Sequence, residues 1–317
     1  MTNLSVPPDK QVYEEHSELM HYTTADGLKG IVTSKTLWAT HAGFLNDSEE
    51  VIGFFGNRLR MILKPELEKH VSESLEQCLA EFLAAFREAQ EQTQDHYVTS
   101  FCTACDGWVS QNGLLSQWRG YGQDGGYAIV FDTKGLDSFL RNDAGHYHDS
   151  EETLVFGDVQ YEEGVEGLSF VCDKQVLDHV QRVRDCFAAC LKQETSWEDY
   201  KAFNSIAVLS TLWKHRGFKE EREVRIIVGE PSPKIQQELA NEVTTPFRRI
   251  YAFSRNGIVV PCIHLFEDQK LETLPIRRII VGPHPDREQR KKAVEILLKN
   301  HGIDAEVTVS ATPFRGR

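Results

Sequence analysis

Residues 19–24 have the sequence LMHYTT, and residues 218–225, much later in the chain, have the sequence FKEEREVR. The first stretch is typical of a short strand, in which His21 and Thr23 share one face and Tyr22 takes the other. The second leads into another strand whose apolar residues alternate with charged ones. Two such strands, distant in sequence, can together line one nucleotide-sized cleft. This pairing directs the fold prediction and the site prediction that follow.

Periodicity and residue preference predict the remaining elements. Strands and helices mix without regular alternation, which favours the α+β class with a mixed or antiparallel sheet over a doubly wound fold. The polar stretch 141–152 is expected to be a loop. Strands are expected near residues 19–22, 36–40, 97–102, 126–132, 154–161, 223–228, 258–266, 277–281 and 305–309, and helices near residues 25–34, 65–92, 173–192, 196–215 and 287–301.

Domain organisation follows from the same patterns. Residues 1–16 are expected to form a flexible leader, and residues 17–317 a single α+β domain with helical insertions near 57–95 and 173–215. The helical stripe between Leu67 and Phe86 has the spacing of a packing surface. Core positions are also expected at Trp197, Phe203, Ile206, Leu209 and Trp213.

Composition excludes several classes of protein. The chain of 317 residues is 40% hydrophobic and 26% charged, with a formal net charge of −13. This charge argues against a surface covered with nucleic-acid contacts. No apolar run approaches the roughly 18–20 residues of a membrane span, and the N-terminus has no apolar signal core, so a cytoplasmic protein without membrane contact is expected. The seven cysteines show no paired spacing beyond Cys102 and Cys105, which predicts neither a disulfide framework nor a metal site.

The His21-Tyr22-Thr23 sequence has two interpretations. A neutral imidazole can hydrogen-bond ribose hydroxyls, and a tyrosine ring can stack on a base. The alternative is a buried histidine with satisfied hydrogen bonds beside an aromatic core residue.

The charged cluster before the late strand also has two interpretations. Glu221, Glu223 and Arg225 are expected on one strand face, opposite Val224. They can form a solvated exterior ladder of ion pairs. Alternatively, the arginine holds a carboxylate inside a cleft, where it can orient a sugar hydroxyl and stabilise a developing oxocarbenium ion.

Residues 116–122 have the sequence SQWRGYG, which combines two aromatic residues, an arginine, an amide and two glycines. Gln117, Trp118, Arg119 and Tyr121 suit a ligand-facing segment, with stacking rings and a phosphate-binding guanidinium. The alternative is a buried tryptophan followed by a turn.

Six ordered sequence blocks resemble those of a bacterial family of unknown function, domain-of-unknown-function family 2971. Its members carry a His-Tyr-Thr start, a Trp-Ala-Thr strand, an Asn-Asp pair, a Thr-Ser-Phe strand, a Leu-Ser-Gln-Trp-Arg block and a Phe-x-Glu-Glu-x-Glu-x-Arg block. The corresponding residues here are 21–23, 38–40, 46–47, 99–101, 115–122 and 218–225.

A second resemblance is to ADP-ribosyltransferases, on residues 20–23, 30–32, 36–38, 99–101 and 221–223. It implies an ADP-ribosyltransferase-like sheet core and NAD as substrate. It also implies that His21 holds the NAD ribose, Ser100 supports the site, Glu223 is the catalytic acid and Glu221 contacts the acceptor. Tyr22 stands where that family has a glycine.

The expected function is therefore NAD-dependent ADP-ribosyl transfer onto a protein or nucleic acid acceptor, or NAD glycohydrolysis. The resemblance suggests a toxin or phage-defence setting. The first alternative is a non-catalytic module that binds or senses a nucleotide, and the second is a metal-dependent nuclease or phosphodiesterase that uses the acidic cluster. The catalytic residues are expected to be Glu223, Glu221 and His21. Residues expected to bind the cofactor are His21, Tyr22, Thr23, Ser100, Gln117, Trp118, Arg119, Tyr121 and Arg225.

Overall fold

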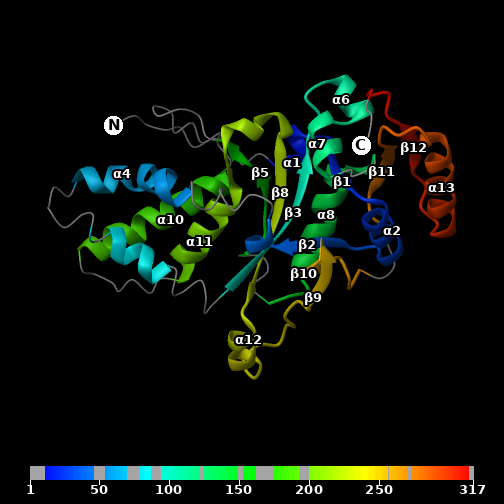
Figure 1. The fold of residues 1–317 in the computed structure, drawn as a ribbon. Helices are drawn as coiled ribbons and strands as arrows, with labels where there is room; N and C mark the ends of the chain where they lie inside the picture. The colour runs from blue at the N-terminus through cyan, green and yellow to red at the C-terminus, as the bar shows by residue number, and fades with distance from the viewer. Residues whose placement is uncertain are drawn as a thin grey trace.

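The computed structural model describes residues 11–45, 54–69, 77, 79–86, 94–121, 125–148, 153–161, 174–192, 200–255, 257–269 and 273–313. A ten-stranded sheet lies at its centre (Figure 1), in the order β12-β11-β4-β1-β3-β2-β10-β9, with β8 paired to β3 and β5 to β8. Among these described strands, only β11 and β12 are paired in parallel. The predicted α+β class with a mixed, mostly antiparallel sheet is confirmed.

The strands of the sheet lie close to the predicted positions, except that β9 was not predicted. A separate ladder pairs β6 (Gln160–Tyr161) with β7 (Trp213–Lys214). The strands of the large sheet are β1 (Glu18–Thr23), β2 (Leu37–His41), β3 (Gln94–Cys102), β4 (Tyr127–Asp132), β5 (Val155–Asp158), β8 (Glu223–Pro231), β9 (Ile250–Arg255), β10 (Ile258–Leu265), β11 (Ile276–Val281) and β12 (Glu306–Val309).

The helices cover both faces of the sheet. No described helix combines the length and apolar content that spanning a membrane requires. The helices are α1 (Val12–Glu15), α2 (Ala25–Ser34), α4 (Leu59–Lys69), α6 (Gly107–Asn112), α7 (Leu115–Tyr121), α8 (Thr133–Ala144), α10 (Lys174–Leu191), α11 (Tyr200–Leu212), α12 (Pro233–Leu239) and α13 (Arg287–Asn300), with the short turns η1 (Ala42–Phe44), η2 (Phe54–Arg58) and η3 (Arg216–Glu221).

Helix α2 shows how local sequence sets these boundaries. The Thr24 side chain caps the start by accepting a hydrogen bond from the backbone N–H of Gly27. Three apolar side chains, those of Leu28, Ile31 and Val32, are buried. Lys35 ends the helix in a left-handed conformation. The predicted range, 25–34, is the observed one.

Helix α8 corrects the prediction of a loop from residue 141, because the helix continues to Ala144. The Asp132 side chain caps its start through the N–H of Gly135, at 2.7 Å, and Leu136 and Leu140 are buried. A capping aspartate directly after a strand is the signal that was missed. The short helices α6 and α12 were also not predicted.

The segments expected as helical insertions contain α4, α10 and α11, grouped at one end of the sheet in Figure 1. The helix predicted for 65–92 begins earlier, with α4 at Leu59, and residues 70–76, 78 and 87–92 lie outside the described residues. Leu79, Phe82 and Phe86 are buried, as are Phe203, Ile206, Leu209 and Trp213, while Trp197 lies outside the described residues. Residues 1–10 of the expected leader are likewise not described, and residues 12–15 form α1, whose Val12 is buried in the core.

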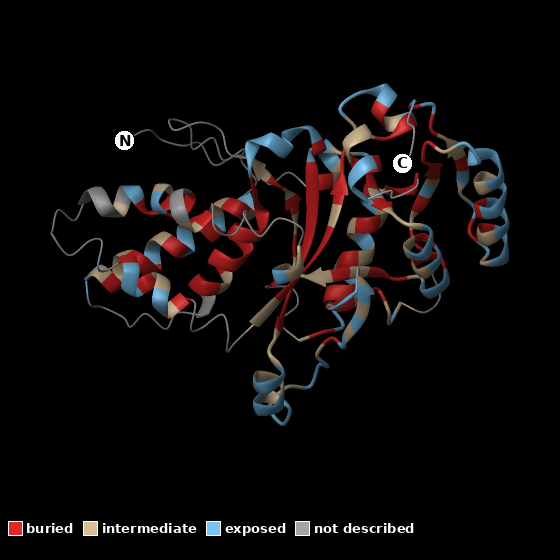
Figure 2. Ribbon diagram, in the orientation of Figure 1, coloured by how far each residue is buried: buried red, intermediate tan, exposed pale blue. Residues whose placement is uncertain are grey.

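Strand β3 separates three groups of core residues. Tyr97 and Phe101 face the core under α2, α8 and α13. On the other face, Val98 joins the core with α4, α10 and α11, whereas Cys102 joins a smaller core with α6 and α7. Ser100 lies between Val98 and Cys102 on that second face. In Figure 2 the central strands are largely buried.

The sheet opens beside Ser100. Strand β8 pairs with β3 along one edge, from Gln94 to Cys102. On the other edge, β1 meets β3 only at Cys102, and β2 meets it only at Tyr97 and Val98. The backbone between these points therefore has neither β1 nor β2 as a ladder partner there. This opening between β1 and β2 positions the candidate site.

Candidate functional site

A pocket of about 190 Å³ lies at the opening between β1 and β2, where the two smaller cores meet. It is bordered by β1, β2, β3, α7 and the start of β8. Eight of the predicted site residues line it: His21, Tyr22, Ser100, Gln117, Tyr121, Glu221, Glu223 and Arg225.

His21 reaches across the opening to β3. Its Nδ1 lies 3.0 Å from the carbonyl oxygen of Ser100. Because a carbonyl only accepts, Nδ1 carries the proton, and Nε2 of the neutral ring is an acceptor. Burial lowers the pKa of His21, against the opposing effect of the Ser100 carbonyl, so the neutral ring is favoured. The imidazole takes the place of a missing strand partner and retains one nitrogen for another group.

Glu223 is buried at the start of β8 and bound by Arg225 on the same strand face. Arg225 donates from Nε to Oε1 of Glu223 at 2.7 Å and from Nη2 to Oε2 at 3.0 Å. Both side chains are only 4% exposed, and Arg225 also donates to the carbonyl of Thr211. Of the two interpretations of this cluster, the solvated exterior ladder is therefore wrong for these two residues.

Lys214 completes the charge cluster and was not predicted. Its ammonium donates to Glu221 Oε2 at 2.8 Å and to Glu223 Oε2 at 3.0 Å. It is 3% exposed, and although burial lowers its pKa, Glu223 and Glu221 raise it overall. Two carboxylates and two cations thus cancel in charge. No sequence motif links Lys214 to the glutamates, since it comes from the short strand β7.

The cluster keeps Glu223 ionised. Burial raises its pKa, but Arg225 and Lys214, with a hydrogen bond from the Ser100 side chain, lower it to about 2. Arg225 supplies two donors, and Lys214 and Ser100 one each. A carboxylate has about four lone-pair sites, so these donors occupy its hydrogen-bonding capacity.

The turn before β8 fixes the positions of Glu221 and Glu223. Glu221 is the last residue of η3, so it does not share the strand face as predicted. Arg222 adopts a left-handed conformation with φ of 44°, and its carbonyl accepts from both the backbone and the side chain of Thr103. The N–H of Glu223 donates to the Tyr161 hydroxyl at 2.8 Å. Glu221 is 12% exposed at its side chain, three times as much as Glu223.

Trp118 does not line the pocket, which corrects its assignment to the ligand-facing set. It is fully buried, and its Nε1 donates to the carbonyl of Asn112 at 2.9 Å. Its ring packs edge-on to Tyr22, and a Cβ at Gly113 would lie 2.5 Å from it. The alternative interpretation, a buried tryptophan anchor, is the one that holds. It positions α7 so that Gln117 and Tyr121 border the pocket.

Two other predicted residues lie outside the pocket lining. Thr23 is turned towards the start of α2, where a Cβ on Gly27 would collide with its hydroxyl. Arg119 is exposed on α7. Gly122, the second glycine of that block, lies outside the described residues.

The structure adds further lining residues that sequence reasoning missed. Trp38 on β2 stacks on His264, with ring centroids 5.2 Å apart. Arg255 at the end of β9 borders the pocket and donates to the carbonyl of Phe44. Cys102 also lines it, and burial raises the pKa of its thiol. Trp38 belongs to a block that the sequence had already marked, whereas Arg255 lies on the strand that was not predicted.

A second buried charge cluster lies away from the pocket. Arg248 contacts Asp143 at 2.5 Å and Glu230 at 3.1 Å, and its guanidinium stacks over Tyr147. The two carboxylates share one cation, so one negative charge is unbalanced within the cluster. Burial raises the pKa of Glu230 to about 7, against the effect of Arg248.

Comparison with known proteins gives one family match over part of the chain and no function. No curated protein and no solved structure matches the chain. The region that does match a family model includes Gln117, Tyr121, Lys214, Glu221 and Glu223 but not His21 or Ser100. Residues 117–226 match the model of the family described as protein of unknown function (DUF2971), so the resemblance predicted from the sequence is confirmed over those residues.

Proposed function

We propose that the pocket binds the nicotinamide–ribose half of NAD and breaks its N-glycosidic bond, with a protein or nucleic acid as the acceptor of ADP-ribose or with water in its place. A toxin or phage-defence role is the setting we propose for such a transfer. The observation that supports this proposal is the convergence of His21, Ser100, Glu221 and Glu223 on one pocket from three separate segments of the chain.

The size of the pocket favours part of a dinucleotide over the whole molecule. Its volume of about 190 Å³ is below the roughly 300–1,000 Å³ of pockets for drug-sized ligands. A pyridine ring or a ribose fits such a space. Tyr121, which is 40% exposed, and Arg255 also line the pocket, and offer a stacking ring and a phosphate-binding cation to the remainder of the ligand.

The charge arrangement suits a cationic transition state. Loss of nicotinamide leaves positive charge on the ribose, and a fixed carboxylate nearby stabilises that charge more than it stabilises the bound substrate. Glu223 is held ionised, and Glu221 is the more accessible of the two acids. His21 Nε2 can accept a hydrogen bond from a ribose hydroxyl.

The geometry changes the roles that we propose for the two glutamates. Because donors already occupy Glu223, we propose that Glu221 contacts the ligand directly and that Glu223 acts through its charge. The assignment from resemblance makes Glu223 the catalytic acid and directs Glu221 towards the acceptor. It therefore predicts that Glu223→Gln reduces turnover more than Glu221→Gln does.

One observation favours the second candidate, a module that binds the nucleotide without chemistry. The hydrogen-bonding capacity of Glu223 is filled by Arg225, Lys214 and Ser100, as in a structural ion network. These hydrogen bonds do not favour a metal-dependent nuclease at this cluster, because the cationic side chains of Arg225 and Lys214 already bind the carboxylate oxygens that a metal would need.

The test is nicotinamide release from NAD by the purified full chain, together with NAD affinity measured by calorimetry. Glu221→Gln is expected to reduce turnover by about 10²-fold with a small change in NAD affinity, the size of other lost electrostatic contacts. Glu220→Gln, at the exposed neighbouring position, is the matched control and is expected to retain full turnover. NAD binding without nicotinamide release would support the non-catalytic module, and the absence of NAD binding would overturn both candidates.

A further inference from the structure

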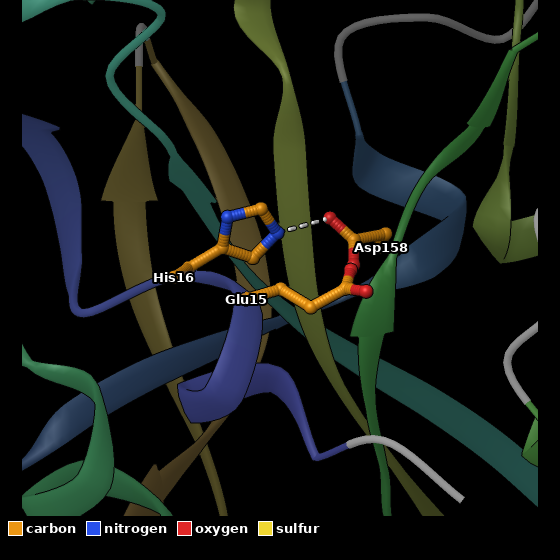
Figure 3. A group of neighbouring side chains, drawn as sticks. All are labelled: Glu15, His16 and Asp158. Atoms are coloured by element: carbon orange, nitrogen blue, oxygen red, sulfur yellow. Dashed lines mark hydrogen bonds and ion pairs between the residues drawn. The ribbon is translucent and has the colours of Figure 1, made fainter. Parts of the chain in front are cut away.

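Three potential metal ligands meet outside the pocket, where α1 leads into β1 and β5 ends. His16 Nε2 lies 2.8 Å from Asp158 Oδ1. One ligand atom from each of Glu15, His16 and Asp158 lies within 4.8 Å of the other two. Figure 3 shows the Glu15 carboxylate beside that of Asp158, with His16 opposite. We propose that these three side chains bind a divalent transition-metal ion.

The donor set indicates the class of ion. One imidazole nitrogen with two carboxylates suits Zn²⁺, Mn²⁺ or Fe²⁺, whereas Ca²⁺ and Mg²⁺ are usually bound by oxygen atoms alone. In a zinc site with bonds of about 2.0–2.2 Å, ligand atoms lie roughly 3.3–3.6 Å apart. The His16–Asp158 separation of 2.8 Å therefore has to widen slightly. Glu15 is exposed and the Asp158 side chain is 40% exposed, so rotation of side chains is sufficient.

Charge supports an occupant that is a cation. The two carboxylates of Glu15 and Asp158 supply negative charge, which a divalent cation would balance. A divalent ion would balance both carboxylates at once and use all three donors.

The position of the cluster indicates what the ion would do. His16 and Asp158 are 142 positions apart in sequence, so the ion would fasten the segment before β1 to β5. Asp158 is the register partner of Val224, and the following residue, Val159, donates its N–H to the carbonyl of Glu223 at 2.9 Å. A bound ion would thus stabilise the strand end that carries Glu223 without touching the pocket. This role is structural and independent of the proposed NAD chemistry.

The test is calorimetric titration of the chelator-stripped full chain with Zn²⁺, with Mn²⁺ and Mg²⁺ in parallel. One saturable Zn²⁺ site is expected, with no comparable Mg²⁺ binding. His16→Ala is expected to weaken Zn²⁺ binding by more than the roughly 10–100-fold lost when an outer-shell partner of a ligand is removed. His284→Ala is the matched control, because His284 forms a looser pair with Asp286, at 3.7 Å, and belongs to no three-ligand group among the described residues.

A second variant and a second measurement keep the result interpretable if His16→Ala folds poorly. Glu15→Gln alters only an exposed side chain, and it is expected to weaken Zn²⁺ binding while circular dichroism stays unchanged. Zn²⁺ should raise the melting temperature of the wild type and of His284→Ala, but not of His16→Ala. Absence of saturable Zn²⁺ binding, or unchanged affinity in His16→Ala, would overturn the site. Unchanged affinity in Glu15→Gln would overturn the three-ligand assignment.

Discussion

The imidazole of His21 and the backbone carbonyl of Ser100 are joined across the opening in the sheet, with Nδ1 3.0 Å from the oxygen. At this point β3 is paired on one edge only, because β1 and β2 have diverged. A side chain thus satisfies a carbonyl that a strand would otherwise bind. His21 also borders the pocket. Different substitutions can therefore separate its contribution to stability from its proposed contact with the ligand.

We expect His21→Ala to lower the free energy of unfolding by about 1–3 kcal/mol, because it leaves the Ser100 carbonyl without its donor. His21→Asn places an amide N–H near the position of Nδ1 and should recover most of that loss, but it has no counterpart of Nε2. It should therefore bind NAD more weakly than the wild type. Urea denaturation and calorimetry of the three proteins measure both effects. Equal NAD affinity in His21→Asn and the wild type would show that Nε2 does not contact the ligand.

The fold was predictable where local patterns suffice. The range of α2 follows from a capping threonine and three apolar positions, and α13 is a mostly polar helix that buries Val294 and Leu298, four residues apart. Strand β9 was missed because its outer positions, Ile250 and Ala252, are exposed at the sheet edge, which weakens the pattern of burial. Long-range pairing, including the opening between β1 and β2, is not encoded in any local period.

The candidate site was also predictable only where the local sequence marks its residues. His21, Glu221 and Glu223 stand out because charged or titratable groups adjoin apolar strand residues. Lys214 was not identifiable, since it follows a helix and reaches the glutamates only after the chain has turned through η3. Trp118 was misassigned because an aromatic ring beside glycine suits a ligand site and a core equally well. Only its burial and its bond to Asn112 distinguish the two.

Lys214→Met is expected to destabilise the protein by about 3–5 kcal/mol, the usual cost of removing one partner from a buried ion pair. The substitution leaves Glu221 and Glu223 with Arg225 as the one remaining cation of the described cluster. Adding Glu221→Gln restores the charge balance, so the double variant should be more stable than Lys214→Met alone. Thermal unfolding of the single and double variants measures this coupling. Strictly additive losses would show that the two groups do not interact.

Leu79→Asp is expected to lower stability by several kcal/mol, because Leu79 is 3% exposed within the core formed by α4, α10 and α11. Ala80→Asp introduces the same charge at the exposed neighbouring position and should change stability little. Chemical denaturation compares the two. Similar stabilities for the two variants would contradict the packing of this segment.

The Asp143–Arg248–Glu230 cluster predicts a pH dependence of stability. The pKa of Glu230 is raised from 4.5 to about 7 in the folded protein, chiefly by burial, so the folded state binds more protons than the unfolded state between these values. The stability that Glu230 contributes is therefore fully present below pH 4.5 and is lost as the pH rises through about 7. At about 1.4 kcal/mol per pH unit, the loss is at most about 3–4 kcal/mol.

Glu230→Gln isolates this contribution, because the amide keeps the shape of the side chain and cannot ionise. The free energy of unfolding, measured by denaturant titration at intervals from pH 4.5 to 8, should fall with rising pH more steeply in the wild type than in Glu230→Gln. The difference between the two proteins removes the contributions of titrating groups outside the cluster, and it retains the coupling of Glu230 to Asp143, whose pKa burial also raises. Parallel profiles would mean that Arg248 keeps Glu230 ionised throughout, and that its pKa is not raised.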